Sequence, residues 1–205
     1  MTRIKICGIT SIEDALAAVD AGADALGFNF AAGPRKIEPA LAIEMIAQLP
    51  PFVTVVGVFI GEDPTIAAIA DGCGVQVIQL HGGESEEFAI SLSPRPVIRV
   101  IHASDAGAIE AIPSYASASA ILLDTSVAGK LGGTGRTFDW DIAVRAKEYG
   151  KPIILAGGLN PVNVAAAVAK VGPYAVDVAS GVESSPGKKD YRLMKEFVRN
   201  VRALD

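Results

Sequence analysis

The feature that most constrains the fold is a regular alternation of short apolar runs with longer amphipathic stretches. The apolar runs are rich in Val, Ile and Leu, which indicates β-strands, at 3–7, 24–30, 53–60, 75–80, 96–101, 120–125, 152–156 and 174–180. Each run precedes a stretch with helical spacing of its apolar residues, at 11–22, 39–50, 63–72, 84–92, 105–113, 138–150, 160–172 and 190–204. Strands that alternate with helices predict βαβ units and a parallel sheet.

The eight repeats favour one closed architecture. Eight units form a (β/α)8 barrel, the TIM barrel, whereas a doubly wound open sheet more often has five or six strands. The chain of 205 residues has no linker or change in composition that would divide it. We therefore expect an α/β fold with a single (β/α)8 barrel domain over 1–205, of the phosphate-binding type.

Composition limits the binding partners, the cofactors and the cellular location that we expect. With a net charge of −5, the chain lacks the excess of basic residues that binding to nucleic acids requires, so we expect no nucleic-acid partner. No apolar run is long enough to span a bilayer and no signal peptide is seen, so we expect no membrane partner and a cytoplasmic protein. With two histidines, two cysteines and no paired ligand motif, we expect no metal and no other cofactor.

The barrel predicts where the chemistry lies, because the loops at the carboxyl ends of the strands carry the site in such folds. Glycines follow the seventh strand in "LAGGLNP" and the eighth in "VASGVESSPGKKD". Backbone N–H groups approach phosphate closely where side chains are small, and these two loops are the usual phosphate site. We predict phosphate binding by Gly157, Gly158, Ser180 and Gly181; the alternative is that these glycines only form tight turns.

The loop after the sixth strand, "DTSVAGKLGGTGRTFDW", is long for a connection between a strand and a helix. Its Gly132 and Gly133 are candidates for substrate binding, as a cover or as a second anion site. The segment does not have the Walker spacing.

A thiol and a carboxylate are expected to face one another across the barrel mouth. Cys7 ends the first strand and Asp124 ends the sixth, so they are candidates for a general base and a general acid. The base must be a thiolate, which requires a lowered pKa of Cys7. The alternatives are a buried packing role for Cys7 and a capping or loop hydrogen bond for Asp124.

Three further residues are candidates for substrate binding. Arg35, on the loop after the second strand, has the guanidinium geometry that clamps a carboxylate, although most arginines are simply exposed. His81 in "QLHGGE" is a candidate base, ligand or orienting donor. Asp177 in "AVDVAS" points either into the barrel or outwards, and if buried it needs a partner.

These motifs together resemble the phosphoribosylanthranilate isomerases, from residue 3 to about residue 190. The matching segments are "KICGIT", "GPR", "IQLHGGE", "LLDT", "GGTGRTFDW", "LAGGLNP" and "VDVASGVESSPGKKD". The resemblance implies an Amadori rearrangement of N-(5-phosphoribosyl)anthranilate to 1-(o-carboxyphenylamino)-1-deoxyribulose 5-phosphate in tryptophan biosynthesis. That reaction needs neither a metal nor a redox cofactor.

The resemblance also assigns roles. Asp124 corresponds to the general acid that opens the sugar ring, and Cys7 to the general base that removes the C2′ proton. Arg35 corresponds to the residue that holds the anthranilate carboxylate, and the glycine loops to the phosphate grip. Family members often carry serine before the Pro-Arg of the second loop, where this chain has Gly33, which affects carboxylate recognition.

Other readings predict different residues. A ribulose-phosphate epimerase would need metal-binding histidines and aspartates, an indole-glycerol-phosphate synthase strand-end lysines, and a histidine-pathway isomerase an aspartate in place of Cys7. A non-catalytic barrel would bind a phosphorylated ligand without turnover. Both a monomer and a homodimer are compatible with the sequence.

Overall fold

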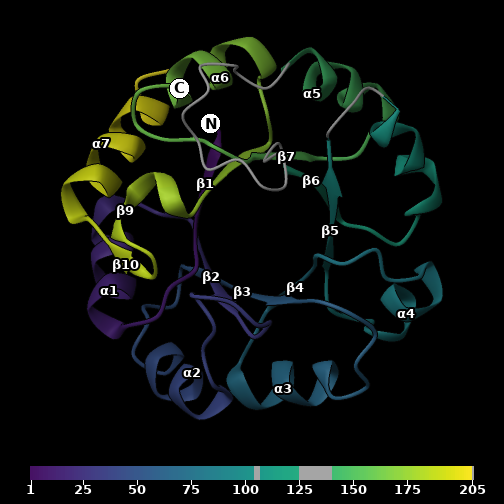
Figure 1. Ribbon diagram of the computed structural model, residues 1–205, viewed down its shortest axis with the longest axis horizontal. Helices are drawn as coiled ribbons and strands as arrows, with labels where there is room; N and C mark the ends of the chain where they lie inside the picture. Colours follow the sequence, from purple (N-terminus) through teal and green to yellow (C-terminus); the bar gives the residue numbers. More distant parts are fainter. Residues whose placement is uncertain (104–106, 125–139, 205) are drawn as a thin grey trace.

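The computed structural model describes residues 1–103, 107–124 and 140–204 of the chain. Eight parallel strands form a closed barrel in the order β1-β2-β3-β4-β5-β6-β7-β8, surrounded by helices (Figure 1). The expected fold class is confirmed. The strands are β1 (Arg3–Cys7), β2 (Ala25–Asn29), β3 (Thr54–Phe59), β4 (Val77–Leu80), β5 (Val97–His102), β6 (Ala120–Asp124), β7 (Ile153–Ala156) and β8 (Ala175–Val178).

The first and last strands close the barrel by pairing in parallel, with Ile4 beside Val176 and Lys5 beside Asp177. On the other side, β5 and β6 pair with His102 beside Asp124. Because the strands are parallel, their carboxyl ends lie next to one another at the same rim of the barrel. The residues expected to form the site lie at this rim.

The outer layer consists of α1 (Ile12–Ala21), α2 (Pro39–Ile46), α3 (Ile66–Cys73), α4 (Glu86–Ser91), α5 (Trp140–Ala146), α6 (Val164–Val171) and α7 (Tyr191–Arg202). The described part of the chain also contains three 3-10 helices: η1 (Ala108–Ser114), η2 (Lys147–Tyr149) and η3 (Ser180–Val182). An α-helix was predicted at 105–113, but the described residues of this segment form the 3-10 helix η1 instead. Pro113 lies inside it and has no N–H for a helical hydrogen bond.

Two apolar layers hold the barrel together. Alternate residues of the strands point inward and pack on one another, including Val56, Val100, Leu122 and Ile154. The opposite faces pack against the helices in the larger core, as Ile4, Ile6, Phe28 and Phe197 do. Among the residues described, no helix is both long and apolar enough to cross a membrane.

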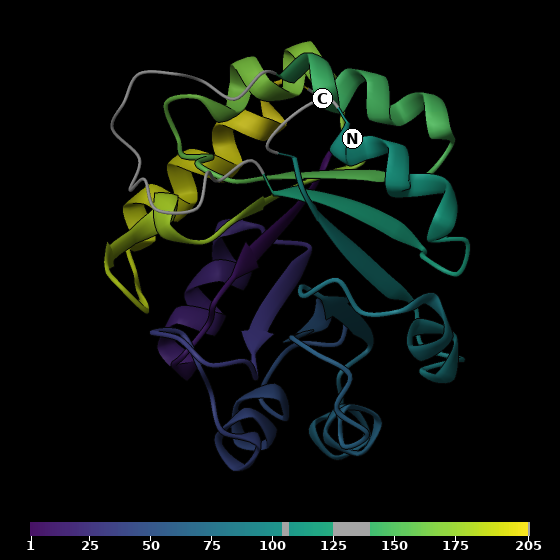
Figure 2. The ribbon, with the colours of Figure 1, turned by 45° about the vertical axis from the view of Figure 1, so that its right-hand side comes forward.

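A short hairpin extends the chain after the eighth strand. It consists of β9 (Glu183–Ser185) and β10 (Lys188–Lys189), which pair antiparallel beyond the barrel strands (Figure 2). The Lys189 N–H donates to Asp14 Oδ2 of α1 at 2.9 Å. The Thr10 hydroxyl donates to the Gly187 carbonyl at 2.5 Å. These bonds fix the hairpin against α1 and the loop that follows Cys7.

Candidate active site

A cavity of about 260 Å³ lies at the carboxyl ends of the barrel strands. Most of the residues expected at the site line it, and they come from both halves of the chain. The lining comprises Cys7, Asn29, Arg35, Val58, Gln79, His81, Leu122, Asp124, Ala156, Gly157, Gly158, Leu159, Asp177, Val178, Ala179 and Ser180. The expected convergence of Cys7 and Asp124 on one cavity is thus found.

Cys7 is buried at the end of β1, and its Sγ lies 3.7 Å from Asn29 Oδ1. Burial raises the pKa of this thiol, while the positive charges of Lys5 and Lys189 lower it; burial outweighs them. The protein environment alone therefore does not supply the lowered pKa that a thiolate base requires. The physical reason is that removing a thiolate from water costs more here than the two ammonium groups return.

Lys5 explains part of the environment of Cys7. Its Nζ donates to Asp177 Oδ1 at 2.9 Å, and both side chains are almost fully buried. A methyl group at Gly27 would lie 2.7 Å from Cys7 Sγ and 3.1 Å from Lys5 Nζ, so this glycine makes room for the thiol beside the ammonium group. Asp177 therefore points into the barrel and has a cationic partner.

The direction of the Cys7 pKa can be measured directly. We expect the thiolate absorbance of the Cys73→Ala variant to rise with a midpoint above the ordinary cysteine pKa of about 8.5, because burial raises the pKa of Cys7. The same titration in denaturant should return the ordinary value. A folded-state midpoint below the denatured one would mean that the lysines outweigh burial.

Arg35 lies at the mouth but is held by an acidic residue of the hairpin. Its Nε and Nη2 donate to the two carboxylate oxygens of Glu183, each at 2.7 Å. The buried Lys189 donates to the same carboxylate at 2.8 Å and to the Cys7 carbonyl at 2.6 Å. Gly8 adopts a φ of +75°, and a Cβ there would overlap Arg35 Cδ. This network attaches the loop after β1 to the hairpin after β8.

His81 and Asp124 approach one another on the far side of the cavity from the hairpin network, with 3.6 Å between His81 Nε2 and Asp124 Oδ2. Burial lowers the pKa of His81, and the Asp124 carboxylate opposes this effect. The lowered pKa favours the neutral imidazole, in which one ring nitrogen donates a hydrogen bond and the other accepts one. The ring of His102 is 5.0 Å from that of His81 between centroids.

The two glycine loops meet at the rim. Gly157 and Gly158 have φ values of +79° and +65°, which favour glycine. A Cβ at Gly181 would overlap the Leu159 carbonyl, so the loops after β7 and β8 touch through their backbones. Ser180 lines the cavity, while Gly181 is not among its described lining residues. Gly132 and Gly133 lie outside the described residues.

Sequence reasoning missed several polar residues of the site. Lys5 could have been found, because it precedes Cys7 by two residues and alternate residues of a strand share a face. Gln79 is buried in the cavity lining, and its Oε1 has no hydrogen-bond partner among the residues described. The roles of Glu183 and Lys189 carry no local signal, because their partners Arg35 and Cys7 are distant in the sequence.

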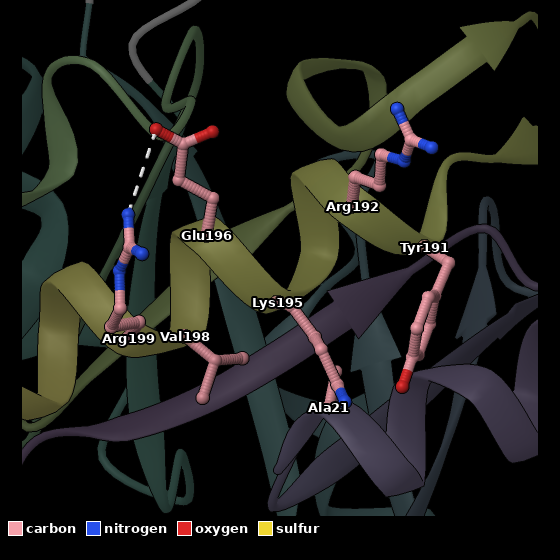
Figure 3. Close-up of a pocket in the computed structure, with 7 residues that line it drawn as sticks. All are labelled: Ala21, Tyr191, Arg192, Lys195, Glu196, Val198 and Arg199. Carbon is pink, nitrogen blue, oxygen red and sulfur yellow. Dashed lines mark ion pairs between the residues drawn. The ribbon is translucent and has the colours of Figure 1, made fainter.

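A wider hollow lies on the outer surface between α7 and α1 (Figure 3). Its charged residues interact with neighbours on these helices: Arg199 Nη2 is 3.9 Å from Glu196 Oε1, and Lys195 Nζ is 3.5 Å from Asp20 Oδ2. Lys195 also lies over the Tyr191 ring. These are surface contacts on the helical layer, away from the strand ends.

The fold and the cavity define a class: a (β/α)8 barrel with a thiol and a carboxylate in one cavity at the carboxyl ends of its strands. The comparisons with known proteins are specific. Residues 4–200 match the profile of the family described as N-(5'phosphoribosyl)anthranilate (PRA) isomerase. The chain belongs to this family.

Relatives and solved structures agree with that assignment. The chain is 51% identical over 206 residues to N-(5'-phosphoribosyl)anthranilate isomerase of Geobacter sp. (strain M21), covering 100% of each. It is 50% identical over 201 residues to that of Pelobacter propionicus, covering 97% of this chain and 95% of the relative. The phosphoribosyl anthranilate isomerase structure from Thermotoga maritima has a TM-score of 0.93 at 42% identity, covering 99% and 100% of the two chains.

Proposed function

We propose that this chain isomerises N-(5'-phosphoribosyl)anthranilate to 1-(o-carboxyphenylamino)-1-deoxyribulose 5-phosphate, as a step of tryptophan biosynthesis. The observation that carries the proposal is the convergence of the Cys7 thiol and the Asp124 carboxylate on one cavity, in a member of this isomerase family. A family member has been crystallised with the reduced form of that product, which supports the same ligand here.

Asp124 is the proposed general acid. It ends β6 at the rim and lines the cavity, with a side chain that is 17% exposed. A proton from its carboxyl group to the furanose ring oxygen opens the ring and leaves a Schiff base at C1′. His81 Nε2 lies 3.6 Å from Asp124 Oδ2, so the imidazole is placed to orient this carboxyl group.

Cys7 is the proposed general base. Its thiolate removes the proton from C2′ and gives an enolamine, which tautomerises to the ketone by protonation at C1′ and loss of the hydroxyl proton. Because burial raises the pKa of Cys7, the thiolate needs compensation from nearby charge. Lys5 and Lys189 supply positive charge, and the cationic Schiff base adds to it.

The remaining residues bind the substrate in this proposal. Arg35 directs its Nε and Nη2 edge to Glu183, so a substrate carboxylate would meet its Nη1 end. Gln79 offers a buried amide oxygen to a sugar hydroxyl, and Asp177 contacts the sugar while holding Lys5.

The proposed phosphate-binding site is formed by the backbone of Gly157, Gly158, Ser180 and Gly181. The left-handed glycines and the direct contact between the two loops support it, because both features bring backbone N–H groups close to a ligand. Gly132 and Gly133, on the long loop after β6, remain proposed substrate contacts.

Turnover of freshly prepared substrate tests the activity. We expect purified protein to consume N-(5'-phosphoribosyl)anthranilate without added metal, seen as loss of its fluorescence. The histidine-pathway aldose substrate, assayed in parallel, tests for a second activity. Binding of the product analogue without turnover of either substrate would contradict the proposal and favour a non-catalytic phosphate-binding barrel.

The setting of the activity is also proposed. The enzyme works in the cytoplasm on a small phosphorylated molecule, and neither nucleic acid nor a membrane takes part. The barrel elements run from Arg3 to Arg202, which supports one domain. The family member from Thermotoga maritima is dimeric, so a homodimer is a candidate state beside the monomer.

A further inference from the structure

Three metal-ligand side chains meet at one side of the barrel mouth. His81 follows β4, His102 ends β5 and Asp124 ends β6, so they come from three neighbouring strands. One ligand atom of each lies within 4.8 Å of those of the other two. The chain has only these two histidines, and the fold places both in the same cluster.

The cluster follows from the alternation of the strands. Val100 of β5 and Leu122 of β6 point into the barrel interior. His102 and Asp124 are two residues further along the same strands, so they continue the inward-facing rows up to the rim. His81 likewise follows the cavity residue Gln79 by two positions on the β4 side. The three side chains therefore project from the carboxyl ends of three neighbouring barrel strands.

The spacing suits a tetrahedral ion. With bonds of about 2.0–2.1 Å, two ligands of tetrahedral zinc lie roughly 3.3 Å apart. His81 Nε2 and Asp124 Oδ2 are 3.6 Å apart, so this pair needs almost no movement. His102 is exposed at the rim and can rotate toward them. Its exposure also gives an ion access from solvent and leaves the fourth position to water.

We propose that His81, His102 and Asp124 form a binding site for one zinc-class divalent ion, and that the ion inhibits the enzyme. Two imidazoles and one carboxylate select zinc, cobalt, nickel or copper over magnesium and calcium, which prefer all-oxygen sites. The inhibition rests on the proposed function, because a metal-bound Asp124 cannot act as the acid. An inhibitory ion is compatible with turnover that needs no metal.

Calorimetric titration of untagged, chelator-treated protein with Zn²⁺ tests the site without reference to activity. We expect one equivalent to bind, and His102→Ala to weaken the affinity by at least about tenfold, since even outer-shell changes cost a metal site this much. Mg²⁺ should give no heat of binding. Co²⁺ should give the visible absorption of a tetrahedral complex in the wild type but not in His102→Ala.

Control variants separate this site from the two thiols. Cys7→Ala and Cys73→Ala should bind Zn²⁺ as the wild type does. Loss of binding in Cys7→Ala together with unchanged binding in His102→Ala would overturn the proposal, as would absence of binding to the wild type. His102→Gln, which keeps a polar side chain of similar length, repeats the test if the alanine variant does not fold.

Activity measurements distinguish the proposed metal site from the proposed isomerase function. Zn²⁺ should inhibit the wild type at the concentration at which it binds, and the metal-free His102→Ala variant should turn over normally and resist Zn²⁺. Equal inhibition of both proteins would overturn the inhibitory role. If no preparation turns over substrate, the proposed function fails, while the calorimetry still decides the metal site.

Discussion

Replacing Cys7 with alanine is expected to lower kcat by at least about 10²-fold, and Asp124→Asn is expected to do the same, which is the usual scale for acid–base groups. Both side chains line one cavity, and each is assigned one proton transfer of the proposed reaction. Steady-state turnover of N-(5'-phosphoribosyl)anthranilate at saturating substrate measures the effect, because it isolates kcat from binding.

Matched controls distinguish chemistry from damage to the fold. Cys73→Ala removes the other buried thiol, which lies in α3 and donates to the Pro39 carbonyl. Asp20→Asn removes an exposed carboxylate of α1, which accepts from the Tyr191 hydroxyl. Both controls should keep normal kcat. A rate within about threefold of the wild type in Cys7→Ala or Asp124→Asn would remove that residue from its role, since this is well below the acid–base scale.

Lys5→Met is expected to lower the free energy of unfolding by about 3–5 kcal/mol, the cost of leaving one partner of a buried ion pair unpaired. The side chains of Lys5 and Asp177 are only 4% and 10% exposed. Burial lowers the pKa of Lys5, but the combined effect of Asp177 and Cys7, which raise it, is larger. The pKa of Lys5 therefore lies above the ordinary lysine value. The stabilisation is therefore complete at neutral pH and is lost only as the pH rises through the folded-state pKa.

Urea unfolding at pH 7 measures this loss, and an exposed pair supplies the control. Lys36 Nζ lies 2.7 Å from Glu38 Oε1, with side chains 45% and 70% exposed. Lys36→Met should cost at most about 1 kcal/mol, because solvent screens such pairs. The double variant Lys5→Met with Asp177→Asn should recover part of the stability. A Lys5→Met loss as small as that of Lys36→Met would contradict the buried-pair explanation.

Much of the barrel could be predicted, because the signals are local. The alternation of apolar runs and helical spacing predicted eight strands, and each of the eight barrel strands lies at an expected position, whereas the short hairpin strands β9 and β10 were not predicted. Strand-end positions then placed Cys7, Asp124 and Gly157 at the catalytic rim. The fifth helical element was less predictable: its apolar spacing indicated an α-helix, but Pro113 removes a backbone donor and the described residues form a 3-10 helix.

The electrostatic surroundings of the site could not be read in the same way. The role of a general base requires a lowered pKa of Cys7, but the direction of its pKa shift depends on how deeply the folded barrel buries the thiol. Arg35 was expected to bind a carboxylate of the substrate, whereas in the structure Glu183 of the hairpin already accepts hydrogen bonds from two of its N–H groups. These effects depend on distances between groups that no sequence spacing specifies.

The sequence by itself determined the (β/α)8 architecture, the rim that carries the chemistry and the motifs of the isomerase family, because periodicity and strand ends are properties of neighbouring residues. Only the tertiary structure decided which residues meet across the mouth. Closure of β1 against β8 buries Lys5 with Asp177, and the adjacency of β4, β5 and β6 brings His81, His102 and Asp124 together. The physical reason is that burial and charge act through space, between segments that only the closed barrel makes neighbours.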